Sequence, residues 1–174
     1  MNPLLSEGVN IIISNLEHHA NIVPWHFLRE RKGVQIKWID CDQNGKFDIN
    51  QFEKAITSKT KLIAVTQMSN VLGASPDIKN IIELSHSQGI PVLIDGCQGV
   101  VHEKIDVQDL DCDFYLFSGH KLYGPNGIGI LYAKSQYLDR MRPWRGGGDM
   151  IKYVQKENIT YNDCLLYTSD AADE

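Results

Sequence analysis

A lysine amine stands among potential hydrogen-bond donors in the stretch Ser118-Gly119-His120-Lys121-Leu122-Tyr123-Gly124-Pro125. The stretch follows a short apolar run, residues 114–117, of the kind that forms a buried strand. Because glycines and a proline then interrupt the chain, we expect Lys121 to lie in a loop at a strand end. An amine there could form a Schiff base with a carbonyl cofactor, while Ser118 and His120 donate hydrogen bonds to a phosphate. The alternative is an ordinary surface loop.

A carboxylate and an amide follow another expected strand. Asp95 closes the apolar run 91–94, and Gln98 comes three positions later. A carboxylate in this place could pair with a protonated pyridine nitrogen and keep the ring an electron sink, and the amide could bind a ring oxygen. The structural alternatives are a turn or helix-cap aspartate and a surface glutamine.

Two further polar side chains follow strand ends. His18 could stack its flat imidazole on a flat cofactor, or it could start a helix with a local hydrogen bond. Asn70 lies in a glycine-containing loop, where it could contact substrate or a ring oxygen, or simply form a turn. Ligands of parallel α/β sheets gather beyond the strand ends. We therefore expect one crevice lined by His18, Asn70, Asp95, Gln98, Ser118, His120 and Lys121.

Strands and helices are expected to alternate along the chain. Apolar and β-branched runs predict strands at residues 9–14, 34–40, 62–66, 91–94, 113–117 and 128–132. Helices are expected from the region of residues 18–25 to Arg31, and at 49–56, 77–88 and 135–141. Pro24, Asp48 and Gly89 are suitable start and stop signals for three of them. This alternation predicts an α/β layer structure around a largely parallel sheet.

Composition excludes several classes of function. The chain has 174 residues, of which 43% are hydrophobic and 22% charged, as in an ordinary globular domain. A net charge of −5 without a long basic run argues against nucleic acid as a partner, and no apolar stretch approaches the length of a membrane span. Residues 1–8 do not resemble a signal peptide, and the four cysteines show neither a CxxC pair nor metal-ligand spacing. We therefore expect a cytoplasmic protein with reduced thiols and no metal.

Four segments together resemble a known family: Ser14 to Trp25, Ser69 to Gly73, Asp95 to Gln98, and Asp111 to Pro125. They are similar to the group II cysteine desulfurases of the SUF type. These enzymes belong to the class V aminotransferase superfamily, which has pyridoxal-phosphate fold type I. The resemblance runs from about Gly8 to about Ile151. It implies the large domain of that fold, a mostly parallel sheet with helices on both faces, truncated at both ends.

The resemblance also implies a role for each candidate residue. Lys121 would hold pyridoxal phosphate covalently and then move protons, His18 would stack on the ring, and Asp95 would pair with the pyridine nitrogen. The remaining contacts would be Gln98 at the ring hydroxyl, Ser118 and His120 at the phosphate, and Asn70 near the substrate carboxylate. Cys97 stands where the family more often has alanine, and we do not expect it to be the nucleophile.

The activity that the resemblance implies is conversion of L-cysteine to L-alanine. Sulfur would pass as an enzyme persulfide to an acceptor protein for iron–sulfur cluster assembly, in a homodimeric parent. The family's nucleophilic cysteine and its carboxylate-binding arginine have no counterpart in this chain, so we expect a fragment with little or no activity of its own. The alternatives are another class V enzyme, such as a selenocysteine lyase or a kynureninase-like hydrolase, and a non-catalytic truncated domain.

The last eleven residues look foreign to the rest. Residues 164–174 can be reverse-translated into DNA that resembles the transposon-end adapter of sequencing libraries; the alternative is a natural acidic tail. We therefore expect residues 1–163 to be a partial cofactor-binding domain and residues 164–174 to be adapter read-through.

Overall fold

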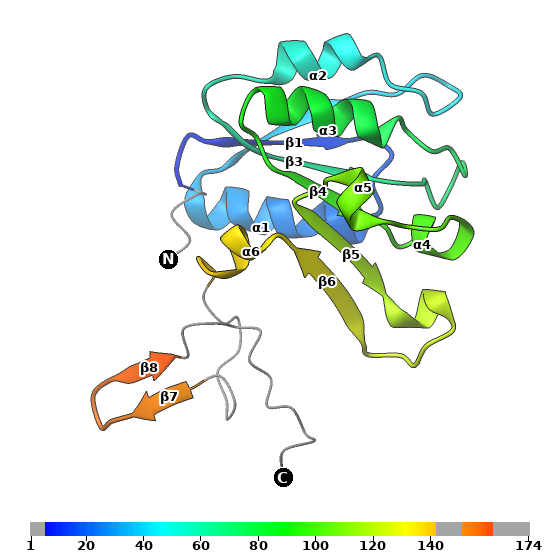
Figure 1. Ribbon diagram of the computed structural model, residues 1–174. Helices are drawn as coiled ribbons and strands as arrows, with labels where there is room; N and C mark the ends of the chain where they lie inside the picture. Colours follow the sequence, from blue (N-terminus) through cyan, green and yellow to red (C-terminus); the bar gives the residue numbers. More distant parts are fainter. Residues whose placement is uncertain (1–5, 142–150, 162–174) are drawn as a thin grey trace. The chain divides into compact units, whose positions relative to one another are not determined.

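The computed structural model describes residues 6–141 and 151–161. Six strands form one sheet in the order β2-β1-β3-β4-β5-β6 (Figure 1). Their bounds are β1 Asn10–Ser14, β2 Gln35–Ile39, β3 Thr60–Thr66, β4 Val92–Asp95, β5 Phe114–Ser118 and β6 Gly129–Ala133. The chain divides into two compact units, of which the first ends at Tyr132 and the second continues from Ala133.

The first five strands of this sheet are parallel to their neighbours. β6 lies at the edge beside β5 and runs in the opposite direction in Figure 1. The Gly119 N–H, directly after β5, donates to the Ile128 carbonyl at 2.9 Å. The sheet is therefore mostly parallel, as the sequence predicted.

Helices lie on both sides of the strands. Figure 1 shows α2 (Ile49–Ala55) and α3 (Ile78–Ser87) together on one side and α1 (Val23–Lys32) on the other. Every residue of β1 is buried, because both faces of this strand are covered. The core under α2 and α3 includes Ile12, Phe52, Ile63, Ile82 and Val92. The predicted fold class, a layered α/β domain with helices on both faces, is thus confirmed.

Local end signals explain most helix boundaries. The Asp48 and Asp77 side chains accept hydrogen bonds from first-turn N–H groups of α2 and α3. Pro24 lies in the first turn of α1, and Gly33 follows this helix at φ +67°. The predicted strands agree with the observed ones to within about two residues at each end.

Other local predictions were incomplete or wrong. The helix expected from residues 18–25 is two elements, the 3-10 turn η1 (His19–Asn21) and α1. Lys121 lies in a second 3-10 turn, η2 (Gly119–Leu122), rather than in an irregular loop. The short helices α4 (Gly99–His102) and α5 (Val107–Leu110) were not predicted. Helices of one turn bury too few residues to leave a hydrophobic period in the sequence.

The second unit contributes three short described elements. α6 (Ser135–Leu138) is shorter than the helix predicted at 135–141, and β7 (Ile151–Val154) pairs antiparallel with β8 (Ile159–Tyr161). The proline and glycines of residues 143–148 predict a loop from the sequence. This segment and the suspected read-through at 164–174 lie outside the described residues. None of the helices in the described ranges is long and apolar enough to cross a membrane.

Candidate active site

A pocket of about 390 Å³ lies beyond the carboxyl ends of β1, β3, β4 and β5. All seven side chains that the sequence singled out line it. The lining residues are His18, Ala20, Thr66, Met68, Asn70, Asp95, Cys97, Gln98, Ser118, His120 and Lys121. The structure therefore brings together one amine, one carboxylate, two imidazoles and several amide, hydroxyl and thiol groups.

Strand order explains why these distant residues meet. β1, β3, β4 and β5 are consecutive neighbours in a parallel sheet, so their carboxyl ends share one edge. Thr66 at the end of β3 pairs in register with Asp95 at the end of β4, and Asp95 pairs with Leu116 of β5. Each strand then continues into a turn that supplies part of the pocket.

Asp95 is the buried acid of this pocket. Only 4% of it is exposed, and its Oδ1 accepts a hydrogen bond from the Cys97 N–H at 3.0 Å. The Gly96 N–H donates to the Leu116 carbonyl at 2.9 Å, which ties the turn after β4 to β5. This anchoring holds the carboxylate at the strand end, and Gln98 directly precedes α4.

Lys121 is half-buried in η2, three residues beyond Ser118, where β5 ends. The Gly124 N–H donates to the Gly119 carbonyl at 2.9 Å, which closes this turn. Ser118, the last residue of β5, has its Oγ 3.4 Å from the Cys97 Sγ. Burial raises the pKa of the Cys97 thiol, and the Asp95 carboxylate adds to this shift. The thiol is therefore held in its neutral, weakly nucleophilic form.

His18 is exposed and caps η1. Its Nδ1 accepts a hydrogen bond from the Ala20 N–H at 3.2 Å. Because Nδ1 is an acceptor, the ring proton of the neutral imidazole is on Nε2. The local hydrogen bond expected for a helix-start histidine is thus present together with the pocket position.

Sequence reasoning missed the buried acid beside this histidine. Glu17 is 7% exposed and accepts hydrogen bonds from Ser14 Oγ, from Asn21 Nδ2 at 2.7 Å and from the Thr66 N–H at 3.0 Å. The Ser14–Glu17 spacing, typical of a capping box, was the available signal. Thr66, Met68 and Ala20 also line the pocket and were not singled out, because backbone position rather than chemistry places them there.

Glu17 gives the fold a predictable pH dependence. Burial raises its pKa from 4.5 to about 7, despite its hydrogen bonds, and the nearby Asp95 charge acts in the same direction. Below pH 4.5 the group is protonated in both the folded and the unfolded chain. Between pH 4.5 and about 7 only the unfolded chain has lost the proton, so stability falls through this window by roughly 3 kcal/mol.

Urea unfolding of the native chain and the Glu17→Gln variant at a series of pH values measures this effect. We expect the native chain to lose stability relative to the variant as pH rises between 4.5 and 7, with no further divergence above that range. If the native chain instead gains stability relative to the variant as pH rises, the pKa of Glu17 is lowered in the folded chain and the prediction is wrong.

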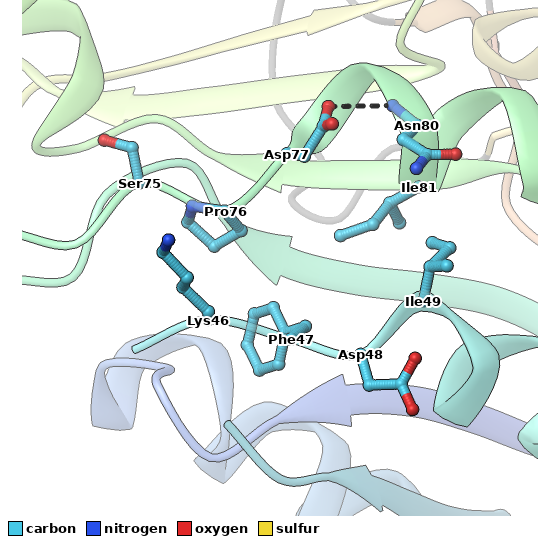
Figure 2. Close-up of a pocket in the computed structure, with 9 residues that line it drawn as sticks. All are labelled: Lys46, Phe47, Asp48, Ile49, Ser75, Pro76, Asp77, Asn80 and Ile81. Atoms are coloured by element: carbon cyan, nitrogen blue, oxygen red, sulfur yellow. Dashed lines mark hydrogen bonds between the residues drawn. The ribbon is translucent and has the colours of Figure 1, made fainter. Parts of the chain in front are cut away.

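A second pocket, of about 420 Å³, lies between the starts of α2 and α3 (Figure 2). Its two aspartates are occupied as helix caps: Asp48 Oδ1 accepts from the Asn50 N–H at 3.0 Å and Asp77 Oδ1 from the Asn80 N–H at 3.2 Å. Much of the remaining lining is apolar, with Phe47 among it. This pocket also contains an amine, Lys46, but both of its aspartates are exposed, whereas Asp95 is buried beside Lys121. The strand-end pocket therefore remains the candidate active site.

Comparison with known proteins agrees with this geometry. The Aminotransferase class-V family model matches residues 1–166. A cysteine desulfurase of Enterobacter sp. (strain 638) is 51% identical over 161 residues, and one of Yersinia pestis (strain Pestoides F) is 53% identical over 160 residues. These alignments cover 92% and 91% of this chain but 40% and 39% of the relatives, so the chain spans about 40% of their length.

Solved structures show the same similarity. The cysteine desulfurase CsdA from Escherichia coli (S-sulfonic acid) superposes with a TM-score of 0.89 at 44% identity, covering 94% of this chain and 41% of that one. The apo cysteine desulfurase from Thermococcus onnurineus NA1 gives 0.85 at 30% identity, covering 92% and 40%. On the sequence match, the shared fold and the strand-end pocket, this chain belongs to the class V aminotransferase family.

Proposed function

We propose that this chain is the cofactor-binding part of a pyridoxal-phosphate-dependent cysteine desulfurase. The observation that carries the proposal is the strand-end pocket, in which Lys121 and the buried Asp95 line the same cavity. The named relatives are cysteine desulfurases, which favours this function over a selenocysteine lyase, a kynureninase-like enzyme or a non-catalytic domain.

The donor set of the pocket fits pyridoxal phosphate. The cofactor needs a primary amine for its aldehyde, an anion for its pyridine nitrogen and hydrogen-bond donors for its phosphate. Lys121, Asp95 and the pair Ser118 and His120 offer these groups around one cavity. When bound, the cofactor supplies an electron sink for the charge left on the substrate α-carbon as its proton departs.

The chain's own residues would have distinct roles around that group. Lys121 would hold it and then move a proton at the substrate α-carbon. Asp95 would keep the ring nitrogen protonated, since a buried carboxylate stabilises an adjacent cation. His18, with its proton on Nε2, would cover the ring. Gln98 would bind the ring hydroxyl oxygen, and Asn70 would lie near the substrate carboxylate.

The complete reaction would turn L-cysteine into L-alanine and pass sulfur to an acceptor protein. We propose the SUF type (group II), with iron–sulfur cluster assembly in the cytoplasm as the destination and a homodimer as the working form. The motif resemblance supports these finer assignments. We also propose that residues 164–174 are adapter-derived, and resequencing the source DNA beyond Asp163 tests this.

A chimera tests whether this segment performs desulfurase chemistry. The aligned 161-residue segment of the Enterobacter relative is replaced by that of this chain, so that the relative supplies the other 60% of its length. With a dithiol reductant present, which releases the persulfide sulfur as sulfide, we expect the chimera to form alanine and sulfide from cysteine. We expect its Lys121→Ala variant to form neither. We expect the 174-residue chain alone to release little or no sulfide.

Two results would contradict the proposal. One is a folded chimera that captures the cofactor but leaves cysteine unchanged. The other is desulfurase activity that persists in the Lys121→Ala chimera. Sulfide release by the 174-residue chain alone, at the rate of the intact relative and abolished by Lys121→Ala, would overturn the expectation that this segment needs the remainder.

A further inference from the structure

The orientation of His18 depends on the short turn that carries it. Within the described part of the chain, its ring receives one hydrogen bond, from the Ala20 N–H to Nδ1 at 3.2 Å, and the His19 ring lies 5.9 Å away. The ring is exposed, so packing does not hold it in place. Whatever fixes the backbone from His18 to Asn21 therefore also fixes the imidazole at the pocket.

The Glu17 side chain binds the far end of the turn that its own backbone leads into. Glu17 is the residue immediately before His18, and its Oε2 accepts from Asn21 Nδ2, at the other end, at 2.7 Å. Asn21 is itself buried, and its Oδ1 accepts from Trp25 Nε1 of α1 at 3.2 Å. The carboxylate thus closes the turn and joins it to the following helix.

The same carboxylate also joins the turn to the sheet. Glu17 Oε1 accepts from Ser14 Oγ, at the end of β1, and from the Thr66 N–H, at the end of β3. Thr66 is a pocket-lining residue and pairs in register with Asp95. The turn that carries His18 is therefore anchored to the ends of β1 and β3. Of these two strands, β3 is the neighbour of β4, which ends at Asp95.

Burial of the Glu17 carboxylate does not by itself favour folding. Removing a carboxylate from water costs several kcal/mol, and apolar residues of similar size often serve equally well. Glu17 is not a partner in any ion pair of the described residues, so charge pairing does not offset its burial. Its three hydrogen bonds instead define a position, as supporting residues around functional sites commonly do.

We infer that Glu17 is a positioning residue that orients His18 over the cofactor pocket by clamping the His18–Asn21 turn to the ends of β1 and β3. The inference rests on the proposed function in one respect, namely that the group covered by His18 is pyridoxal phosphate. The clamp itself does not need one protonation state. The Ser14 hydroxyl can donate to the carboxylate or accept from the protonated acid.

Imidazole nitrogen NMR of the cofactor-free chain tests the clamp directly. His18 resonances are assigned with a His18→Gln variant, because the chain has six histidines. In the native chain we expect the neutral ring of His18 to have one tautomer, with its proton on Nε2. In Glu17→Gln we expect a mixture of proton positions and faster exchange of the Ala20 N–H. Asn21→Ala, which keeps the acid and removes one donor, should change His18 in the same direction.

Asp113→Asn is the matched control. Asp113 is 2% exposed, its Oδ2 accepts from the Val92 N–H at 2.8 Å, and it faces His86 near the start of β4 rather than the pocket. The Asp113→Asn substitution therefore removes a similarly buried carboxylate that makes no contact with the His18–Asn21 turn. We expect its His18 signals to match those of the native chain.

A cofactor readout separates failure of this inference from failure of the proposed function. We expect Glu17→Gln to bind pyridoxal phosphate about tenfold more weakly, the size of one lost hydrogen bond to a charged group. Its visible circular dichroism should change, while borohydride still fixes the cofactor at Lys121. If the native chain captures no cofactor, the proposed function fails and the NMR result still judges the clamp. Native-like His18 signals in both Glu17→Gln and Asn21→Ala, or equal changes in Asp113→Asn, would overturn the inference.

Discussion

Replacing Lys121 with alanine is expected to abolish covalent capture of pyridoxal phosphate by this chain. Lys121 is the one primary amine among the described residues that line the strand-end pocket. Aldehyde capture needs an unprotonated amine as nucleophile, and neither the imidazoles nor the amides around it can replace that group. The measurement is incubation with the cofactor, borohydride reduction and mass spectrometry of the resulting peptides.

Two variants define the specificity of this result. Lys121→Arg keeps the positive charge, but a guanidinium stays protonated, so we expect the same loss of covalent capture. Lys46 lines the second pocket (Figure 2), and Lys46→Ala should leave labelling at Lys121 intact. Labelling that moves to surface lysines in native amounts, or that is unchanged in Lys121→Ala, would show that the pocket is not the capture site.

The second large effect is expected from Gly96→Ala. A Cβ atom at Gly96 would lie 2.1 Å from Tyr115 Cζ, 2.2 Å from its Oη and 2.3 Å from its Cε1. The Tyr115 ring is 2% exposed, and its hydroxyl donates to Gln67 Oε1 at 2.6 Å. Because the ring is packed and tethered, the backbone between Asp95 and Cys97 must shift instead.

We expect this substitution to cost about 3 kcal/mol or more of folding free energy, at or beyond the upper end for overpacking a core. Cofactor capture should fall with it, since the displaced backbone carries Asp95. Gly129→Ala is the control, because its Cβ would meet only the Phe117 carbonyl oxygen, at an ordinary 3.7 Å. Urea unfolding measures both variants.

A double variant checks the cause. Adding Tyr115→Leu to Gly96→Ala removes the ring that the new methyl group meets. We expect the combined loss of stability to be smaller than the sum of the two single losses. Strictly additive losses, or a Gly96→Ala chain as stable as the native one, would show that the contact between Gly96 and Tyr115 does not limit this position.

Much of the local structure follows from nearby residues. Apolar runs such as residues 9–14 predicted the strands, and Asp48, Pro24 and Gly89 predicted helix ends, because caps and strand propensity act over a few residues. The seven candidate residues could be selected because each follows a strand end and carries reactive or hydrogen-bonding chemistry. The role of each of these residues toward the cofactor stays a prediction, which the variants described above test in part.

The strand order, the buried network and the shape of the pocket came only from the tertiary structure. The spacing of Ser14 and Glu17 indicates at most a local cap, yet the Thr66 N–H that Glu17 also binds is 49 residues away. Tyr115, whose ring lies against Gly96, and Gln67, which accepts the hydrogen bond of its hydroxyl, are 48 residues apart. The 3-10 turn at Lys121 is attached to β6 through the bond from Gly119 to Ile128. Local preferences act within a few residues, whereas burial and hydrogen bonding of these groups depend on partners that only the folded sheet brings together.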